Sequence, residues 1–247
     1  MYAIQTKKLT KKYRSKTAVS ELDLTVNEGE LFALLGVNGA GKTTTIRMLA
    51  CLSKPTSGEC SVCGSDCLSQ SDDVKKLIGI SPQDTAVAEN LTVLENLKLI
   101  CGIYGYSPQN KSEKIAKMTK LFKLDEVLNS RAKTLSGGWK RKLSIAMALI
   151  CEPKVLFLDE PTLGLDVLAR RELWKVVESL KGRITIVLTT HYMEEAEQLS
   201  DRIAIMIDGS VAALGTLSEL EQQSGESGLE NVFVRIAEDF GKGASDE

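Results

Sequence analysis

The chain has 247 residues, of which 43% are hydrophobic and 26% are charged, a composition typical of a soluble globular protein with a sizeable core. The formal net charge of −2 argues against general nucleic-acid binding, which needs a basic surface, and leaves only a local basic patch to consider. There is no run of about 18 apolar residues, and the first residues lack the apolar core of a secretory signal. We therefore expect a cytosolic protein.

Cysteine usage fits this expectation. The six cysteines are spread along the chain, which favours reduced thiols over a disulfide framework. Cys60, Cys63 and Cys67 have a spacing that would hold zinc only with a fourth ligand, and another role is predicted below for the one histidine. The sequence leaves open whether these three cysteines have any role.

Residues 2–35 read as short extended segments with a turn at 27–29, which predicts an antiparallel β-subdomain. Tyr13 is the one aromatic residue there in a basic setting, between Lys12 and Arg14. It is either an exposed tyrosine on a solvated strand or a platform on which a nucleobase stacks, and the residues alone do not decide between the two.

A phosphate-binding loop is predicted directly after the buried strand expected at 31–35. The stretch Gly36-Val37-Asn38-Gly39-Ala40-Gly41-Lys42-Thr43 has the G-x-x-x-x-G-K-[ST] spacing, and Thr44 opens the helix that follows. Its glycines allow backbone N–H groups to converge on phosphate oxygens at a helix N-terminus. Lys42 supplies a charge for the β- and γ-phosphates, and the hydroxyl of Thr43 can ligate the Mg²⁺ that bridges them.

The middle of the chain changes from strands to helices. Short strands are expected at 59–64 and 77–81, the second running into Pro82 and Gln83. Apolar residues then recur at helical spacings from 91 to 128, which predicts a helical lobe. Next, Ser136, Gly137 and Gly138 open a further helix, as a second anion-binding terminus or as a simple N-cap.

Carboxylates and a histidine follow two of the later strands. The unalternating apolar run 155–158 predicts a parallel strand buried on both faces, and it ends in Asp159 and Glu160. A helix is expected at 166–180, and the strand expected at 184–188 leads to His191. Ligands of open α/β sheets bind at the carboxyl ends of the strands, which favours a functional role for these three side chains over a packing role.

The end of the chain is expected to be simple. The segments 203–207 and 211–214 flank Asp208-Gly209-Ser210, which predicts a β-hairpin. The residues after Gly225 are small, polar and acidic, so we expect a loosely ordered tail apart from the short apolar run 232–234.

Along nearly the whole chain, these segments resemble the ATP-binding subunit of an ABC transporter. The resemblance rests on the Walker A loop at 36–43, the Q-loop at Gln83, the first four signature residues at 135–138, Walker B at 155–160, the D-loop at 165–166 and the switch histidine His191. Six motifs in one order are far more specific than any one of them. The resemblance implies an α/β P-loop NTPase fold with a mainly parallel core sheet, an N-terminal antiparallel β-subdomain and a helical signature subdomain.

The resemblance also implies a domain organisation. We expect an ATPase domain over residues 1–220, whose helical subdomain covers about 84–150, and a short, partly flexible C-terminal extension over 221–247.

Residue roles follow from the resemblance as well. Thr43 and Gln83 would complete the Mg²⁺ shell, with Asp159 holding a metal-bound water. Glu160 would polarise the attacking water, and His191 would contact the γ-phosphate and position that water. Residues 36–44 would bind the phosphates of ATP, and Tyr13 falls where the family stacks an aromatic ring on adenine.

Members of this family hydrolyse ATP as head-to-tail dimers. Ser136, Gly137 and Gly138 would therefore contact the γ-phosphate held by a second ATPase subunit, identical or not. Two positions depart from the family pattern: Trp139 stands where the signature has Gln, and Leu163 stands where a small residue is common. We expect Trp139 to pack on its helix and activity to survive, whereas Leu163 leaves the identity of the partner open.

The segments 165–174 and 193–197 look like those of single-cassette bacterial exporter ATPases that carry ions, drugs or lipids. We therefore expect an ATPase that powers a separate membrane permease, docked near the helical lobe and Gln83, so that the chain reaches the inner face of the membrane only through the permease. The alternatives are a soluble ABC-type ATPase not coupled to transport, which the single cassette disfavours, and a hydrolysis-impaired cassette in a heterodimer. The sequence identifies neither the substrate nor the direction of transport.

Overall fold

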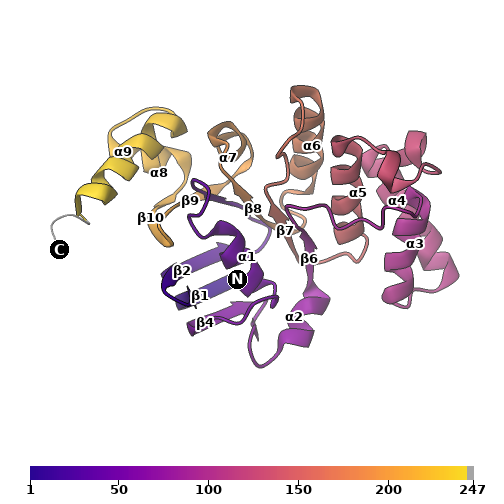
Figure 1. The fold of residues 1–247 in the computed structure, drawn as a ribbon, viewed down its shortest axis with the longest axis horizontal. Helices are drawn as coiled ribbons and strands as arrows, with labels where there is room; N and C mark the ends of the chain where they lie inside the picture. Colours follow the sequence, from indigo (N-terminus) through magenta and orange to yellow (C-terminus); the bar gives the residue numbers. More distant parts are fainter. Residues whose placement is uncertain (244–247) are drawn as a thin grey trace.

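Two β-sheets form the centre of the molecule in the computed structural model, which describes residues 1–243 (Figure 1). The first is antiparallel, with strands in the order β2-β1-β4-β5. Its members are β1 (Tyr2–Tyr13), β2 (Lys16–Asn27), β4 (Ser57–Val62) and β5 (Ser65–Asp66). The predicted antiparallel subdomain is therefore confirmed.

The strands β1 and β2 are longer than the short segments expected from the sequence. Each has 12 residues, and their pairing shifts register repeatedly, for example between Thr6 and Leu9. Lys8 within one shift and Glu21 on the partner strand have positive φ angles of 46° and 44°. Such bulges interrupt the alternation of buried and exposed side chains, so one long strand looks like several short ones in the sequence.

The second sheet carries the candidate site and has the strand order β10-β9-β3-β8-β7-β6. Its strands are β3 (Leu31–Leu35), β6 (Ile78–Ser81), β7 (Val155–Asp159), β8 (Thr185–Thr190), β9 (Arg202–Ile207) and β10 (Ser210–Gly215). All neighbours pair in parallel except β9 and β10. Every residue of β3, β7 and β8 is buried, which explains their unalternating apolar sequences.

Helices cover both faces of the core sheet. Helix α1 (Lys42–Leu49) packs between the two sheets, in a cluster that includes Ile46, Phe32 and Leu24. Helices α6 (Val167–Leu180) and α7 (Met193–Leu199) pack on the opposite face (Figure 1). Helix α2 (Ser71–Leu77) was not predicted, and only one of its residues, Val74, is buried, which is too little to produce a periodic pattern.

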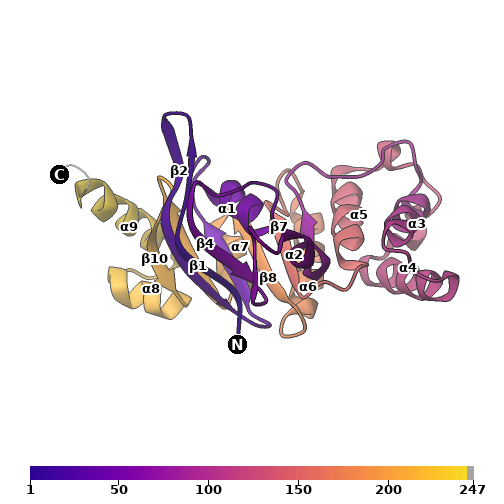
Figure 2. The ribbon, with the colours of Figure 1, turned by 90° about the horizontal axis from the view of Figure 1, so that it is seen from below.

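The predicted helical lobe is present at the end of the molecule opposite the C-terminus (Figures 1 and 2). It consists of α3 (Val93–Ile103), α4 (Pro108–Phe122), the 3₁₀ turns η1 (Leu124–Val127) and η2 (Ala132–Thr134), and α5 (Gly137–Leu149). A capping box between Thr92 and Glu95 fixes the start of α3, and Ser107 caps α4.

The predicted hairpin is also present. Asp208 and Gly209, between β9 and β10, have positive φ angles of 45° and 84°, as a two-residue type I′ turn requires. The turn touches the phosphate loop, since the amide of Gly209 donates to the carbonyl of Ala40 over 3.2 Å.

The prediction of a loosely ordered tail after Gly225 is wrong for residues 229–243. They form helix α9 (Leu229–Gly243), which follows α8 (Leu217–Ser224) and lies beside it. Leu229, Val232, Phe233 and Ile236 are buried at the i, i+3, i+4, i+7 spacing of one helix face. An amphipathic stripe therefore orders a segment whose average composition is polar. Residues 244–247, covered by the same prediction, lie outside the described residues, and the domain boundary at 220 stays a prediction.

Within residues 1–243, no helix has the combination of length and apolar character that crossing a bilayer requires.

Candidate functional site

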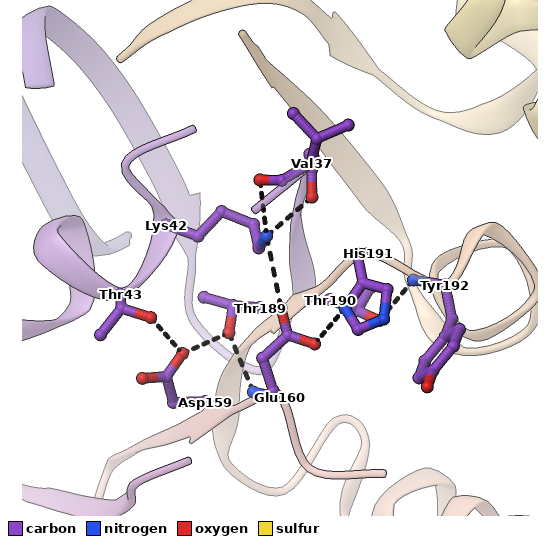
Figure 3. Close-up of polar contacts among 10 residues, drawn as sticks. Val37, Lys42, Thr43, Asp159, Glu160, Thr189, Thr190, His191 and Tyr192 are labelled. Atoms are coloured by element: carbon purple, nitrogen blue, oxygen red, sulfur yellow. Dashed lines mark hydrogen bonds and ion pairs between the residues drawn. The ribbon is translucent and has the colours of Figure 1, made fainter. Parts of the chain in front are cut away.

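The predicted phosphate loop, Asp159, Glu160 and His191 converge at the carboxyl ends of three neighbouring strands (Figure 3). The phosphate loop follows β3, Asp159 ends β7 with Glu160 directly after it, and Thr190 ends β8 before His191. Because β3, β8 and β7 are adjacent and parallel, segments far apart in sequence meet at one edge.

Two glycines of the phosphate loop are required by the fold itself. A Cβ atom on Gly36 would lie 2.4 Å from the carbonyl oxygen of Met206, and one on Gly41 would lie 2.4 Å from that of Ala18. Gly41 also has a φ of 102°, which L side chains rarely adopt. These approaches to backbone atoms fix the loop before any ligand binds.

Lys42 is held by the loop that it belongs to. Its Nζ donates to the carbonyl oxygen of Gly36 over 2.7 Å and to that of Val37 over 3.2 Å, and it lies 3.3 Å from Oε1 of Glu160. The residue is only 5% exposed, so its charge is compensated almost entirely by protein groups. This places an ammonium group at the carboxyl edge, next to the loop, as phosphate binding needs.

Thr43 and Asp159 form the second contact between the loop and β7. Oγ1 of Thr43 donates to Oδ1 of Asp159 over 3.0 Å, and the same carboxylate oxygen accepts from Oγ1 of Thr189 over 2.6 Å. A hydroxyl and a carboxylate are the hard oxygen donors that Mg²⁺ binds, and one or two carboxylates are usual where phosphates supply further ligands. The donor set therefore fits Mg²⁺.

Glu160 lies at the centre of the site. Its Oε2 accepts a hydrogen bond of 2.7 Å from Nδ1 of His191, while its Oε1 faces Lys42. The residue is 5% exposed and has a φ of 49°, which is uncommon for a side-chain-bearing residue and is found at functional sites, where the surroundings enforce it. The strand end thus aims this carboxylate at the phosphate loop.

The threonines at the end of β8 were missed in the sequence. Oγ1 of Thr189 accepts from the amide of Glu160 over 3.0 Å as well as donating to Asp159, so it orients both carboxylate residues. Oγ1 of Thr190 accepts from the amide of Tyr192 over 3.0 Å and shapes the turn at His191. Their position just before His191 was the available signal, but the partners of Thr189 lie 29 and 30 residues away in sequence.

Gln83 is placed near this edge by a residue that was also missed. The guanidinium of Arg141, on α5, donates to the carbonyl of Pro82 over 2.7 Å and to that of Gln83 over 2.6 Å. Arg141 is buried, and burial lowers its pKa. The side chain of Gln83 is exposed, and within residues 1–243 no hydrogen bond joins it to Thr43 or Asp159.

Tyr13 lies at the end of β1 and is 47% exposed. The Nζ atom of Lys11 lies 4.9 Å from the centre of its ring. A ring this exposed has a face available for stacking. The role of Tyr13 as a nucleobase platform stays a prediction.

Ser136 and Gly137 are exposed at the start of α5, in the helical lobe. Ser136 occupies the N-cap position, but its side chain makes no capping hydrogen bond. Its hydroxyl therefore differs from those of Thr92 and Ser107, which cap the neighbouring helices of the lobe.

The two departures from the family pattern both lie beside the helical lobe and the D-loop. Trp139 is half-buried, packs against the core, and has Nζ of Lys142 4.6 Å from its ring centre, in agreement with the packing role expected for it. Leu163 is half-buried in the turn that follows Glu160.

Other candidate features lie apart from this edge. A cavity of about 980 Å³ is present at the amino ends of the strands, lined by residues that include Glu28, Pro153 and Thr185, and none of the predicted site residues lines it. All six cysteines are free thiols, and within residues 1–243 no group of three or more His, Cys, Asp or Glu residues is placed to hold a metal ion.

Comparisons with known proteins show which family the chain resembles. A family model described as ABC transporter matches residues 19–163. The chain is 43% identical over 228 residues to the daunorubicin/doxorubicin resistance ATP-binding protein DrrA of Streptomyces peucetius, covering 92% of this chain and 69% of that protein. It is 43% identical over 226 residues to the phospholipid-transporting ATPase ABCA3 of Homo sapiens, covering 90% of this chain and 13% of that protein. It is 39% identical over 251 residues to the probable multidrug ABC transporter ATP-binding protein YbhF of Escherichia coli, covering 99% of this chain and 43% of that protein.

Solved structures give the same result. A structure of an ATP-binding subunit of an ABC transporter has a TM-score of 0.86 and 31% identity, covering 95% of this chain and 99% of that one. A dimeric, post-hydrolysis ATP-binding cassette bound to ADP and Pi has a TM-score of 0.78 and 28% identity, covering 87% of this chain and 98% of that one. The chain therefore belongs to the ABC transporter family of ATPases, as an ATP-binding cassette with the P-loop NTPase fold.

Proposed function

We propose that this chain binds ATP with Mg²⁺, hydrolyses it, and thereby powers a separate membrane permease. The observation that carries the proposal is the position of Glu160, a buried carboxylate bonded to His191 on one side and facing Lys42 of the phosphate loop on the other. A general base must lie within hydrogen-bond reach of its water and be oriented by a further group. Glu160 meets the second condition directly.

The phosphate loop supplies binding. Residues 36–44 would hold the triphosphate through backbone N–H groups and Lys42, while the exposed ring of Tyr13 would stack on adenine. In the structure, Glu160 forms an ion pair with the ammonium group of Lys42. A γ-phosphate would compete for that ammonium group, and Glu160 would then be released from Lys42 toward the attacking water.

His191 and Thr189 would set the orientation of Glu160 and Asp159 during hydrolysis. The imidazole is hydrogen-bonded to Glu160, and the hydroxyl of Thr189 bonds the amide of Glu160 and the carboxylate of Asp159. Thr43, Asp159 and Gln83 would hold Mg²⁺, which when bound supplies positive charge that stabilises the phosphate oxygens in the transition state.

A head-to-tail dimer would complete the site. Ser136, Gly137 and Gly138 begin a helix of the lobe, where Ser136 and Gly137 are exposed and the Ser136 hydroxyl does not cap its own helix. In a dimer they would reach the γ-phosphate of the second subunit. Val37 in the phosphate loop and Leu168 after the D-loop, exposed by 54% and 77%, would be covered in that dimer.

The relatives favour an exporter of drugs or lipids. Their names describe drug resistance, multidrug transport and phospholipid transport. On the helical lobe, Leu99, Ile103 and Tyr104 are exposed by 44%, 69% and 43%, an apolar surface suited to a permease. The chain would then lie at the cytoplasmic face of the membrane, attached through that permease.

A hydrolysis-impaired cassette is the second candidate, because Trp139 replaces the family's Gln. The packing of its ring on the core and under Lys142 gives a structural reason for the substitution. The steady-state ATPase rate of the purified chain and of Trp139→Gln separates the two candidates. Equal, measurable ATPase rates of the two chains favour an active cassette. A large gain in ATPase rate on restoring Gln favours an impaired one.

Co-purification from detergent-extracted membranes tests the transport role. The tagged Glu160→Gln chain, supplied with ATP and Mg²⁺, should retain a multi-span membrane protein that mass spectrometry identifies, and the triple variant with Ala at Leu99, Ile103 and Tyr104 should lose it. Recovery of ribosomes or DNA instead would contradict the transport role.

A further inference from the structure

A buried carboxylate outside the predicted site lies directly behind it. Glu195, on α7, has no exposed surface, although carboxylates are almost never fully buried without a partner. Its Oε1 accepts a hydrogen bond of 3.0 Å from the indole Nε1 of Trp174, on α6. Neither residue has a role predicted from the sequence.

Within the part of the chain that the structure describes, the carboxylate of Glu195 has one bonded oxygen and one unbonded oxygen. Its Oε2 is buried there with no hydrogen-bond partner, and so is Oγ1 of Thr162. Burial raises the pKa of Glu195, and the hydrogen bond from Trp174 acts in the opposite direction. The bond to Trp174 is therefore the contact that holds this carboxylate in place.

Helix α7, which carries Glu195, begins two residues after His191. Thr190 precedes His191 and accepts a hydrogen bond from the amide of Tyr192, the residue directly before α7. A contact that fixes α7 therefore also fixes the backbone segment of the histidine that bonds Glu160.

Helices α6 and α7 are joined at a second point. The guanidinium of Arg170, on α6, lies 5.0 Å from the ring centre of Tyr192, and its NH1 lies 3.9 Å from a carboxylate oxygen of Glu194. Since α6 follows the D-loop and α7 follows His191, these contacts connect the surface expected to meet a second subunit with the histidine.

We propose that Glu195 is a positioning residue: its hydrogen bond with Trp174 fixes α7 against α6, so that His191, just before α7, keeps Glu160 aligned. The expected effect on kcat rests on the proposed ATP hydrolysis. The expected effect on the position of His191 does not. In this role Glu195 acts through His191 and takes no direct part in the reaction.

The kinetic test compares four variants in the full chain. Glu195→Ala should lower kcat by about tenfold to a hundredfold with the KM for ATP changed less than about twofold, because misplacement of a catalytic group affects the transition state and not ground-state binding. Glu195→Gln retains an acceptor for Trp174 and should recover most of kcat. Trp174→Phe, which removes only the indole N–H donor, should show an intermediate loss. Glu197→Ala removes an exposed carboxylate from the same helix and should match wild type.

The same substitution made in a His191→Ala chain distinguishes a positioning role of Glu195 from general structural support. If Glu195 acts through His191, then Glu195→Ala should lower the single-turnover rate less than about twofold in a His191→Ala chain. Equal losses in the two backgrounds would overturn the proposal, as would a KM that rises as much as kcat falls.

A readout independent of hydrolysis comes from the single histidine. The imidazole resonances of His191 in ¹H NMR spectra should shift in Glu195→Gln and Trp174→Phe and stay in place in Glu197→Ala. Unchanged resonances in both of the first two variants would overturn the positioning role. Shifted resonances in a chain that shows no hydrolysis would support the positioning role and contradict the proposed function instead.

Discussion

The Nζ atom of Lys42 lies 3.3 Å from Oε1 of Glu160, and both side chains are about 5% exposed. The proposed phosphate-binding cation and the proposed general base thus neutralise each other. Each charge depends on the other to remain buried. A nucleotide phosphate that binds Lys42 would therefore also change the surroundings of Glu160.

This pair predicts a stability effect. Lys42→Ala leaves the buried carboxylate of Glu160 without its cation, and breaking a buried pair in this way lowers the free energy of unfolding by about 3 kcal/mol. Lys42→Ala combined with Glu160→Gln removes both charges and should recover most of the loss. Urea unfolding without nucleotide measures both values; equal stability of the single and the double variant would show that the pair is not coupled.

The bridge made by Thr189 predicts an effect on the metal requirement. Thr189→Val keeps the shape of the side chain but removes the hydroxyl that orients Asp159 and Glu160, while Thr189→Ser keeps the hydroxyl. We expect the Mg²⁺ concentration that gives half-maximal ATPase to rise about tenfold in the valine variant, the lower end of the range for lost outer-shell partners. The serine variant should stay within about threefold of wild type. Unchanged Mg²⁺ dependence in the valine variant would remove Thr189 from the site.

Burial of Glu195 predicts a pH dependence of stability. Because its pKa is raised above the ordinary value of 4.5, the folded chain binds this proton more tightly than the unfolded chain does. The stability that this group contributes is complete below pH 4.5 and is lost as the pH rises through the folded-state pKa. Glu195→Gln cannot ionise there, so its free energy of unfolding relative to wild type should increase from pH 4.5 to pH 8. A pH-independent difference between the two chains would contradict this.

Helix α9 offers a matched pair of valines. Val232 is fully buried and Val234 is 52% exposed. Val232→Ala should lower the free energy of unfolding by about 2 kcal/mol through lost burial and the cavity that remains, whereas Val234→Ala should change it by less than about 0.5 kcal/mol. Thermal or urea denaturation of the two variants measures both changes in the free energy of unfolding. Equal small effects would mean that the helix does not pack in solution.

Most of the site was predictable because its motifs are local in sequence. The phosphate loop, the carboxylates after β7 and the histidine after β8 each follow a strand with a clear apolar pattern, and parallel pairing brings such strand ends together. The contacts of Thr189 with Asp159 and of Arg141 with the carbonyl of Gln83 join segments 30 and 58 residues apart. No local pattern encodes such contacts.

The prediction of secondary structure was wrong in segments where average composition and hydrophobic periodicity indicate different structures. Helix α9 carries a narrow apolar stripe in a polar segment, so average composition suggested disorder while the spacing of Leu229, Val232 and Ile236 indicated a helix. The bulges in β1 and β2 had the opposite effect, hiding two long strands behind an interrupted alternation.

The most direct test of the central claim is single-turnover ATP hydrolysis by Glu160→Gln, with Glu197→Gln as a control for the same change at an exposed position. We expect Glu160→Gln to bind ATP with Mg²⁺ as tightly as wild type and to hydrolyse it at least about a hundredfold more slowly, since the lost group acts in the transition state. The control should hydrolyse at the wild-type rate. A Glu160→Gln chain that hydrolyses ATP as fast as wild type would contradict the assignment of Glu160 as the base.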